Sequence, residues 1–149
     1  MLRRMALTFY FFAFILSRTV LCAGSSSEVV ERFVSSFDDH DVPAVLALVH
    51  PEVEWLSVNG SEVSVESRGV AALESAITSY FRSCPTCRAS VEVSSVNGPF
   101  VTAIETATWE SGGFTRSQSS TSVYEIVGGQ VLRVWYYPAV KPPGGTWQN

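Results

Sequence analysis

In three stretches of the first half of the chain, apolar residues recur three or four positions apart, which is the spacing of helices with one buried face. This pattern predicts helices at about residues 25–37, 41–50 and 70–81. Ser25 and Glu28 have the spacing of a capping box at the start of the first helix. Asp41 can cap the second helix, which we expect to end at His50.

From residue 89 the pattern changes to the alternation of β-strands, with glycine-containing turns between them. It predicts an antiparallel meander of strands at residues 89–96, 100–110, 115–127 and 130–137. One further short strand is expected at residues 53–58, ending at Asn59-Gly60. The order helix, helix, strand, helix and meander is typical of an α+β fold.

The N-terminus has the layout of a secretory signal peptide. Two arginines precede the apolar run Ala6–Leu16, and small residues follow at Ala23 and Gly24. The run is shorter than the roughly 18 residues of a membrane span, although a signal anchor is the alternative because Arg18 follows it closely. We expect a secreted or periplasmic protein without a stable membrane span after cleavage. Its parts would be a signal peptide at 1–24, one domain at 25–138 and a flexible tail at 139–149.

Removal of the predicted signal peptide makes the chain more acidic. The full sequence carries 10 basic and 14 acidic residues, a net charge of −4, and several of its arginines lie in that leader. The mature chain therefore lacks the basic surface that nucleic acid requires, which excludes that class of partner. Its length is that of one ordinary domain with its own core.

Three segments of the chain carry a family resemblance: VERFVSSFDDHDVPAVLALVHPEVEW, SRGVAALESAITSYF and VYEIVGGQVLRVWYYP. Together with the element order, they make the chain resemble the nuclear transport factor 2-like superfamily, and within it the SnoaL-like branch. The resemblance implies a curved antiparallel sheet wrapped by three helices into a cone, a cystatin-like roll open at one end. Such cones include ketosteroid isomerases, polyketide cyclases, dehydratases and epoxide hydrolases, and also binding modules without activity, so the fold alone assigns no function.

Three positions disfavour the ketosteroid isomerase mechanism. That family uses a carboxylate base, a tyrosine and a protonated aspartic acid. By the resemblance, Phe33 stands in place of the tyrosine, Trp55 in place of the base and Ser122 in place of the acid. None of these side chains can perform the corresponding step.

The strand VTAIETATWE carries a single charge on its more apolar face. Alternation puts Glu105 on the same face as apolar residues from Val101 to Trp109. By the resemblance this face lines the cone, where burial would raise the carboxyl pKa toward neutral and suit Glu105 to general acid or base catalysis. The structural alternatives are a buried ion pair with Arg88 or Arg116, or a bulge that turns Glu105 to solvent.

Aromatic and hydroxyl side chains are expected to line the same cavity, and together they suit a small hydrophobic ligand. The candidates are Phe33, Trp55, Trp109, Ser120, Ser122, Tyr124 and Tyr136. For each aromatic residue taken singly, a place in the ordinary core is the alternative.

Cys84 and Cys87 lie between the third helix and the meander, in the segment CPTC. A redox pair usually has its first cysteine at a helix N-terminus, whereas Cys84 ends a helix. A metal site lacks its other ligands, and we predict no metal and no cofactor. In an exported chain, loss of Cys22 with the leader leaves this even pair, which favours a disulfide over reduced structural thiols.

Two functional classes remain open on this sequence. One is a cofactor-free acid–base enzyme of isomerase, cyclase or dehydratase type, with Glu105 transferring a proton on a hydrophobic carbonyl compound. The other is an exported, non-catalytic binding or dimerisation module that uses the cavity or the outer sheet face. The resemblance also implies a homodimer packed through that outer face, where Arg133, Trp135 and Tyr137 would lie.

Overall fold

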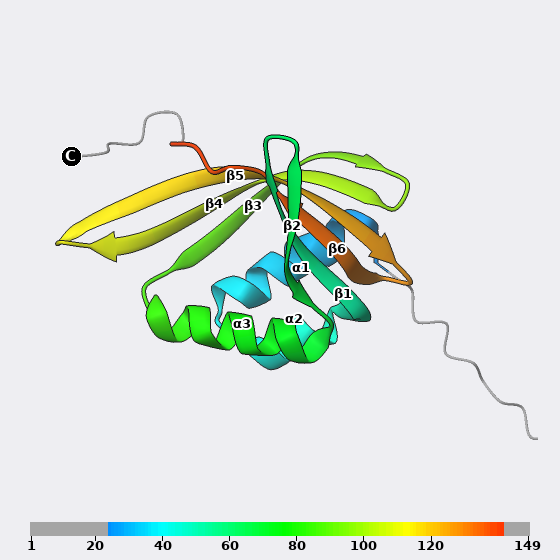
Figure 1. Ribbon diagram of the computed structural model, residues 1–149, viewed down its shortest axis with the longest axis horizontal. Coiled ribbons are helices and arrows are strands. Elements are labelled where there is room, and N and C mark those ends of the chain that lie inside the picture. Colours follow the sequence, from blue (N-terminus) through cyan, green and yellow to red (C-terminus); the bar gives the residue numbers. More distant parts are fainter. Residues whose placement is uncertain (1–23, 142–149) are drawn as a thin grey trace, which may run out of the picture.

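The sheet of this protein curves over three helices, which pack against one of its faces (Figure 1). The computed structural model describes residues 24–141. The helices are α1 (Ser26–Asp38), α2 (Val42–Ala47) and α3 (Val70–Ser83). The strands are β1 (Val49–Asn59), β2 (Glu62–Arg68), β3 (Arg88–Asn97), β4 (Phe100–Ser111), β5 (Phe114–Val127) and β6 (Gln130–Tyr136).

The strands follow the order β2-β1-β6-β5-β4-β3 across the sheet. Strands β3 to β6 form the predicted antiparallel meander, close to the predicted bounds. β1 joins the other edge of β6 in parallel, with Trp55 opposite Val134. The curved sheet and its helices confirm the predicted α+β cone.

Local hydrogen bonds explain where the first two helices begin. The Ser25 hydroxyl accepts from the Glu28 amide at 3.3 Å, and the Glu28 carboxylate accepts from the Ser25 amide at 2.7 Å, which is the predicted capping box. The Asp41 carboxylate accepts from the Ala44 amide at 3.0 Å and caps α2. The prediction that the second helix reaches His50 is wrong, because the chain has already entered β1 and paired with β6.

Strand β2 is absent from the sequence-based prediction. β1 ends at Asn59, as predicted, but the turn that follows, Gly60-Ser61, belongs to a hairpin into β2, with Gly60 at a φ of 63° that favours glycine. Val63 and Val65 alternate along β2 but are exposed, so no buried apolar face marks the strand. β2 pairs antiparallel with β1 and forms an edge of the sheet.

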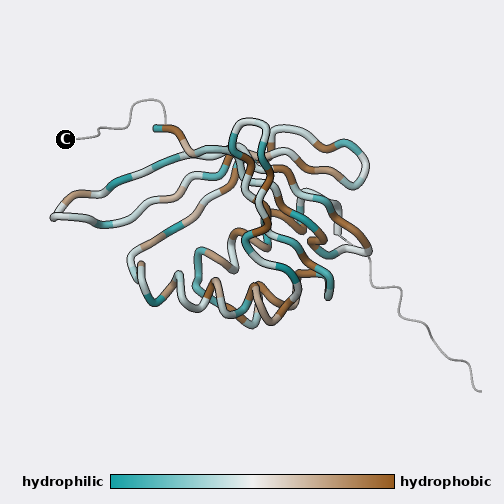
Figure 2. The backbone as a smooth tube through the Cα atoms, in the orientation of Figure 1, coloured by the Kyte–Doolittle hydropathy of each residue, from teal (hydrophilic) through white to brown (hydrophobic). Residues whose placement is uncertain are grey.

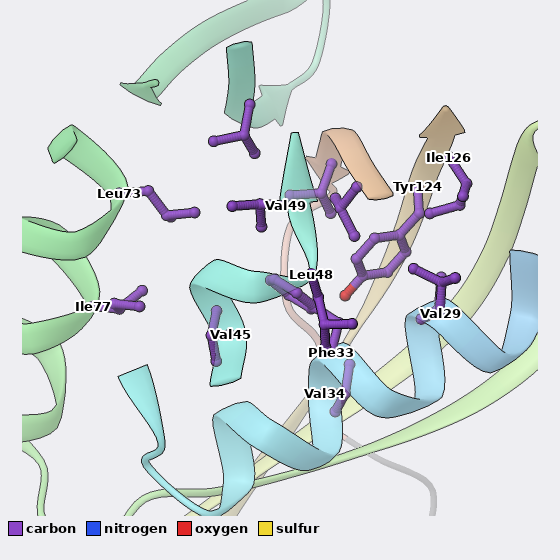
Figure 3. Packing of buried hydrophobic residues seen from close by; sticks show 14 of the residues in the cluster. Val29, Phe33, Val34, Val45, Leu48, Val49, Leu73, Ile77, Tyr124 and Ile126 are labelled. Carbon is purple, nitrogen blue, oxygen red and sulfur yellow. The ribbon is translucent and has the colours of Figure 1, made fainter. Parts of the chain in front are cut away.

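Hydrophobic positions recur along the helices and the strands (Figure 2), and the buried ones form one core between the helices and the sheet. Val30 and Phe33 of α1 and Val134 of β6 are almost fully buried. The ring of Tyr124 lies close to Val29 and Phe33 in this core (Figure 3). Burial of these side chains fixes α1 against the sheet and so sets the position of the residues beside it.

Two predicted segments lie wholly or partly outside the described residues. Of the predicted signal peptide, residues 1–23 lie outside the described residues and Gly24 is described. Of the predicted tail, residues 139–141 are described, and Val140 continues the sheet through backbone hydrogen bonds of 2.7 and 2.8 Å with Ser119. Within residues 24–141, no helix is long and apolar enough to cross a membrane.

Candidate functional site

The cone encloses a cavity of about 410 Å³ between α1, α3 and the inner face of the sheet. Its aromatic walls are formed by Phe33, Phe37, Trp55, Tyr80 and Tyr136. Polar groups reach it from Glu66, Ser67, Arg88, Glu105, Thr106, Gln118 and Ser120. An apolar cavity of this size with a few polar groups suits a small organic ligand.

Glu105 lies on the inner face of β4, and two tyrosine hydroxyls hold its carboxylate. Tyr124 of β5 donates to Oε1 at 2.6 Å, and Tyr136 of β6 donates to Oε2 at 2.9 Å. The two hydroxyl oxygens are 3.2 Å apart. Three neighbouring strands each contribute one side chain to this group, which we refer to as the carboxylate–tyrosine cluster.

No cation neutralises this carboxylate within the described chain. The ion pairs of residues 24–141 involve Glu54 and Glu125, and neither Arg88 nor Arg116 pairs with Glu105. The pairing of β4 with β5 also runs without a register shift past Glu105. Both structural alternatives for Glu105, the buried ion pair and the exposing bulge, are therefore wrong.

Burial raises the pKa of Glu105, because apolar surroundings disfavour the charged form, and polar contacts with Ser122, Tyr124 and Tyr136 offset part of the rise. Glu105 as a residue is half-buried and lines the cavity, while its carboxyl group is packed among protein atoms. Burial also raises the pKa of both tyrosines well above the usual value, so both stay protonated and remain donors. A carboxyl group in this state is suited to proton transfer.

Ser122 lies beside the carboxylate–tyrosine cluster with a fully buried side chain. Its hydroxyl is close enough to lower the pKa of Glu105, yet its Oγ makes no hydrogen bond of good geometry in the part of the chain that the structure describes. We therefore treat the contact as electrostatic, since a hydrogen bond depends on direction as well as on distance. The serine leaves one buried hydroxyl unpaired beside Glu105.

An aromatic wall supports the cluster from the α1 side. The Trp55 ring of β1 stacks on Tyr136, with ring centroids 5.1 Å apart and planes 17° apart. Phe33 packs at 6.2 Å from Trp55 and at 5.9 Å from Tyr124. Because these rings restrain one another, Tyr136 is held with its hydroxyl toward Glu105.

The predicted site residues fall into three places. The cavity wall includes Phe33, Trp55, Glu105, Ser120 and Tyr136. Tyr124 and Ser122 are fully buried and lie behind this wall, beside Glu105. Trp109 is not among the residues that line the cavity within residues 24–141; it lies further out on β4, half-buried and opposite Arg116.

Several cavity residues were missing from the sequence-based candidates. Gln118 lies two residues before Ser120 on the same face of β5, so strand alternation could have identified it. Phe37 and Tyr80 reach the cavity from α1 and α3, where helical spacing alone does not separate a cavity wall from the core. Arg88, considered only as an ion-pair partner, lines the cavity itself.

The sulfur atoms of Cys84 and Cys87 are 2.05 Å apart, which is disulfide distance. The pair closes the turn between α3 and β3, and Cys87 is buried and lines the cavity. The Cys87 carbonyl lies 2.9 Å from Nε2 of His40 and accepts from Nη1 of Arg88 at 2.8 Å. The cysteine pair therefore ties the end of α3 to the cavity wall.

The family model of the SnoaL-like domain matches residues 30–134 of this chain. A protein from Pseudomonas putida KT2440 described as a candidate polyketide cyclase is 22% identical, with a TM-score of 0.57 over 77% of this chain and 92% of that chain. TerC co-crystallized with polyporic acid is 18% identical, with a TM-score of 0.61 over 79% of this chain and 92% of that chain. None of the curated protein sequences matches this chain.

A third similar structure is an NTF2-like protein of unknown function from Burkholderia pseudomallei K96243, which is 16% identical. Its TM-score is 0.62, over 76% of this chain and 89% of that chain. At such low identities, likeness to solved structures shows the fold alone. The family model, however, covers most of the sequence, and the chain therefore belongs to the SnoaL-like family of the nuclear transport factor 2-like superfamily.

Proposed function

We propose that this protein is a cofactor-free acid–base enzyme that acts on a hydrophobic carbonyl compound held in the cavity. The observation that carries the proposal is the carboxylate–tyrosine cluster in the wall of an otherwise apolar cavity. The raised pKa of Glu105 supports it, because a carboxylate with raised proton affinity is a stronger base. Isomerase, cyclase and dehydratase reactions that proceed through an enolate begin with such a proton transfer.

In the proposed step, the ligand binds with a carbonyl group near Tyr136 and a neighbouring C–H bond near Glu105. The Glu105 carboxylate takes the proton, the C–H electron pair forms the enolate, and the negative charge moves to the ligand oxygen. The newly protonated carboxyl group accepts the Tyr136 hydrogen bond more weakly. The tyrosine hydroxyl, which lines the cavity, can then donate to the enolate oxygen.

Deuterium exchange tests this step without knowledge of the natural substrate. With 2-tetralone in deuterated buffer, we expect the mature protein to exchange the protons next to the carbonyl faster than buffer alone, as followed by proton NMR. Glu105→Gln should return exchange to the buffer rate, and Tyr136→Phe should lower it by about 10- to 100-fold. Tyr137→Phe, an exposed tyrosine outside the cluster, is the matched control. Wild-type exchange at the buffer rate would refute proton transfer from this ketone.

The alternative function is that of a non-catalytic binding module. The apolar cavity by itself supports ligand binding without catalysis as well as it supports an enzyme. Mass spectrometry of small molecules that stay bound to the purified protein separates the two functions. An enzyme should release its product, whereas a binding module should retain one compound in stoichiometric amount through purification.

Export and dimerisation complete the proposal. The predicted signal peptide supports secretion or passage to a periplasmic compartment, and a cysteine pair at disulfide distance suits an oxidising environment.

Ile104 and Tyr137, both exposed, lie on the outer sheet face beside Trp135, by strand alternation. We propose that this face packs against a second copy of the chain.

A further inference from the structure

Three inward positions at one level of the sheet form a row across the cavity wall. Ala89 of β3 lies opposite Ala107 of β4, and Ala107 lies opposite Gln118 of β5. All three residues line the cavity. Because the two alanines contribute only methyl groups, the wall beside Gln118 leaves room for a planar ring that lies over the strands.

The next row of the sheet holds the proposed proton-transfer group. Glu105 lies opposite Val91 of β3 on one side and opposite Ser120 of β5 on the other. Gln118 is therefore the diagonal neighbour of Glu105 across the β4–β5 pair, and such neighbours lie about 7 Å apart. Since both residues line the cavity, a ligand as long as two fused rings can contact both side chains.

The side-chain amide of Gln118 is available to a ligand. The neighbouring hydroxyls already have partners within the protein: that of Ser120 donates to the Tyr137 carbonyl. The Thr106 hydroxyl lies 2.8 Å from that of Ser119, at hydrogen-bond distance. Gln118 is half-buried, and among the residues that the structure describes its side-chain amide makes no hydrogen bond.

An amide that faces an apolar cavity favours a ligand with a matching polar group. The side chain of Gln118 offers one carbonyl acceptor and two N–H donors. A wholly apolar ligand would displace water from this amide and leave it without a partner, which lowers the affinity. A hydroxyl or carbonyl oxygen on the ligand, placed beside Gln118, forms the missing hydrogen bond and avoids that loss.

We propose that Gln118 is a specificity-determining residue that binds a second oxygen on a planar bicyclic ketone, whose carbonyl end lies at Glu105 and Tyr136. The two oxygens of this ligand lie at opposite ends of the ring system, and the ring lies over Ala107. The inference rests on the proposed function, because it takes the ketone end from that proposal and adds the group bound at the other end.

The compounds 6-hydroxy-2-tetralone and 6-methyl-2-tetralone test this role, because they share a shape and differ in hydrogen bonding at the end opposite the ketone. By calorimetry near neutral pH, we expect the mature protein to bind the hydroxy compound about three- to tenfold more tightly. Gln118→Met keeps the length of the side chain and removes its amide. It should reverse the preference, because a methyl group gains more than a hydroxyl from an apolar wall.

Ser117→Ala is the matched control for this variant. Ser117 precedes Gln118 on β5, faces the other side of the sheet by alternation, and is not among the described residues that line the cavity. We expect this variant to keep the wild-type preference. The affinity of each variant for the methyl compound reports whether the cavity is intact.

The deuterium-exchange experiment separates this inference from the proposed function. If wild type does not prefer the hydroxy compound, or if the preference survives in Gln118→Met, the role of Gln118 is overturned, while Glu105-dependent exchange would still support the enzyme. A preference that Gln118→Met reverses, together with exchange at the buffer rate, would support the binding role and refute the proton transfer. Failure of wild type to bind either probe would count against both proposals.

Discussion

At the residue scale, Glu105 is a carboxylate that the fold surrounds with hydroxyl donors in place of a cation. Tyr124 and Tyr136 stabilise its charged form, while burial acts in the opposite direction and is the larger effect. The side chain is therefore less stable as an anion in the folded chain than in the unfolded chain. The free energy of unfolding therefore depends on pH in a way that can be measured.

Replacing Glu105 with glutamine removes the charge and keeps the shape. Because the folded-state pKa is raised above the usual value of 4.5, wild type is most stable below that value and loses stability as the pH rises through the folded-state pKa. Glu105→Gln lacks this loss. We expect its melting temperature, relative to wild type, to increase from about pH 5 to about pH 8 and to be close to or above that of wild type at the higher pH.

Thermal unfolding followed by circular dichroism measures this difference, with Glu92→Gln on the exposed side of β3 as the control. A loss of roughly 3–5 kcal/mol in Glu105→Gln at both pH values would show that a buried cation depends on the carboxylate. That result would contradict the geometry described above.

Alternation along one strand predicts that Glu105 lies on the inner face of the sheet. It does not predict which side chains contact Glu105. Tyr124 and Tyr136 reach the carboxylate because the β4–β5 and β5–β6 registers place the side chains of three strands beside one another. The β5–β6 register contains a shift after Glu125. A single sequence does not specify such a shift. For the same reason, alternation placed Trp109 on the correct face without showing that it lies beyond the cavity wall.

At the element scale, the cysteine pair joins the end of α3 to the start of β3. We expect mature protein from an oxidising compartment to contain the Cys84–Cys87 disulfide, so that neither thiol reacts with an alkylating reagent before reduction. Replacing both cysteines with serine should lower the free energy of unfolding by about 2 kcal/mol, the chain-entropy estimate for so short a loop.

Intact-mass analysis after alkylation checks the bond, and urea unfolding checks its contribution. Cys22 lies in the predicted leader, so labelling is assigned to the mature pair by peptide mapping. If both cysteines are labelled without reduction, they are structural thiols and the predicted disulfide does not form.

The elements that were predicted well are those with a strong local signal and a buried face. The meander strands alternate over long segments, and α1 begins at a complete capping box. The end of α2 and the strand β2 were not predicted, because both depend on pairing with distant or exposed partners. The sequence pattern places the end of a helix at His50, but in the structure the backbone there pairs with β6. The valines of β2 are exposed, so they do not indicate a buried face.

At the scale of the whole molecule, export and self-association are tested together. We expect native mass spectrometry of the secreted protein to show a homodimer whose subunit begins near residues 23–26. A subunit that retains Met1 would refute cleavage of the signal peptide, and a monomer mass at micromolar concentration would refute the dimer. Ile104→Glu on the outer face of β4 should dissociate the dimer, whereas Glu74→Gln, at an exposed position of α3 away from that face, should leave it intact.

The order of the strands also determines when this chain can fold. β6 is the last strand in the described part of the chain, yet it lies between β1 and β5 near the middle of the sheet. Without β6, the β1–β2 hairpin and the β3–β5 meander share no strand pairing, and the backbone edges of β1 and β5 that face β6 have no partner strand within the described sheet. Contacts such as that between Gln130 and Val49, 81 residues apart, close only at the end. We expect this late closure of the sheet to delay folding of the chain, which would suit the export proposed above.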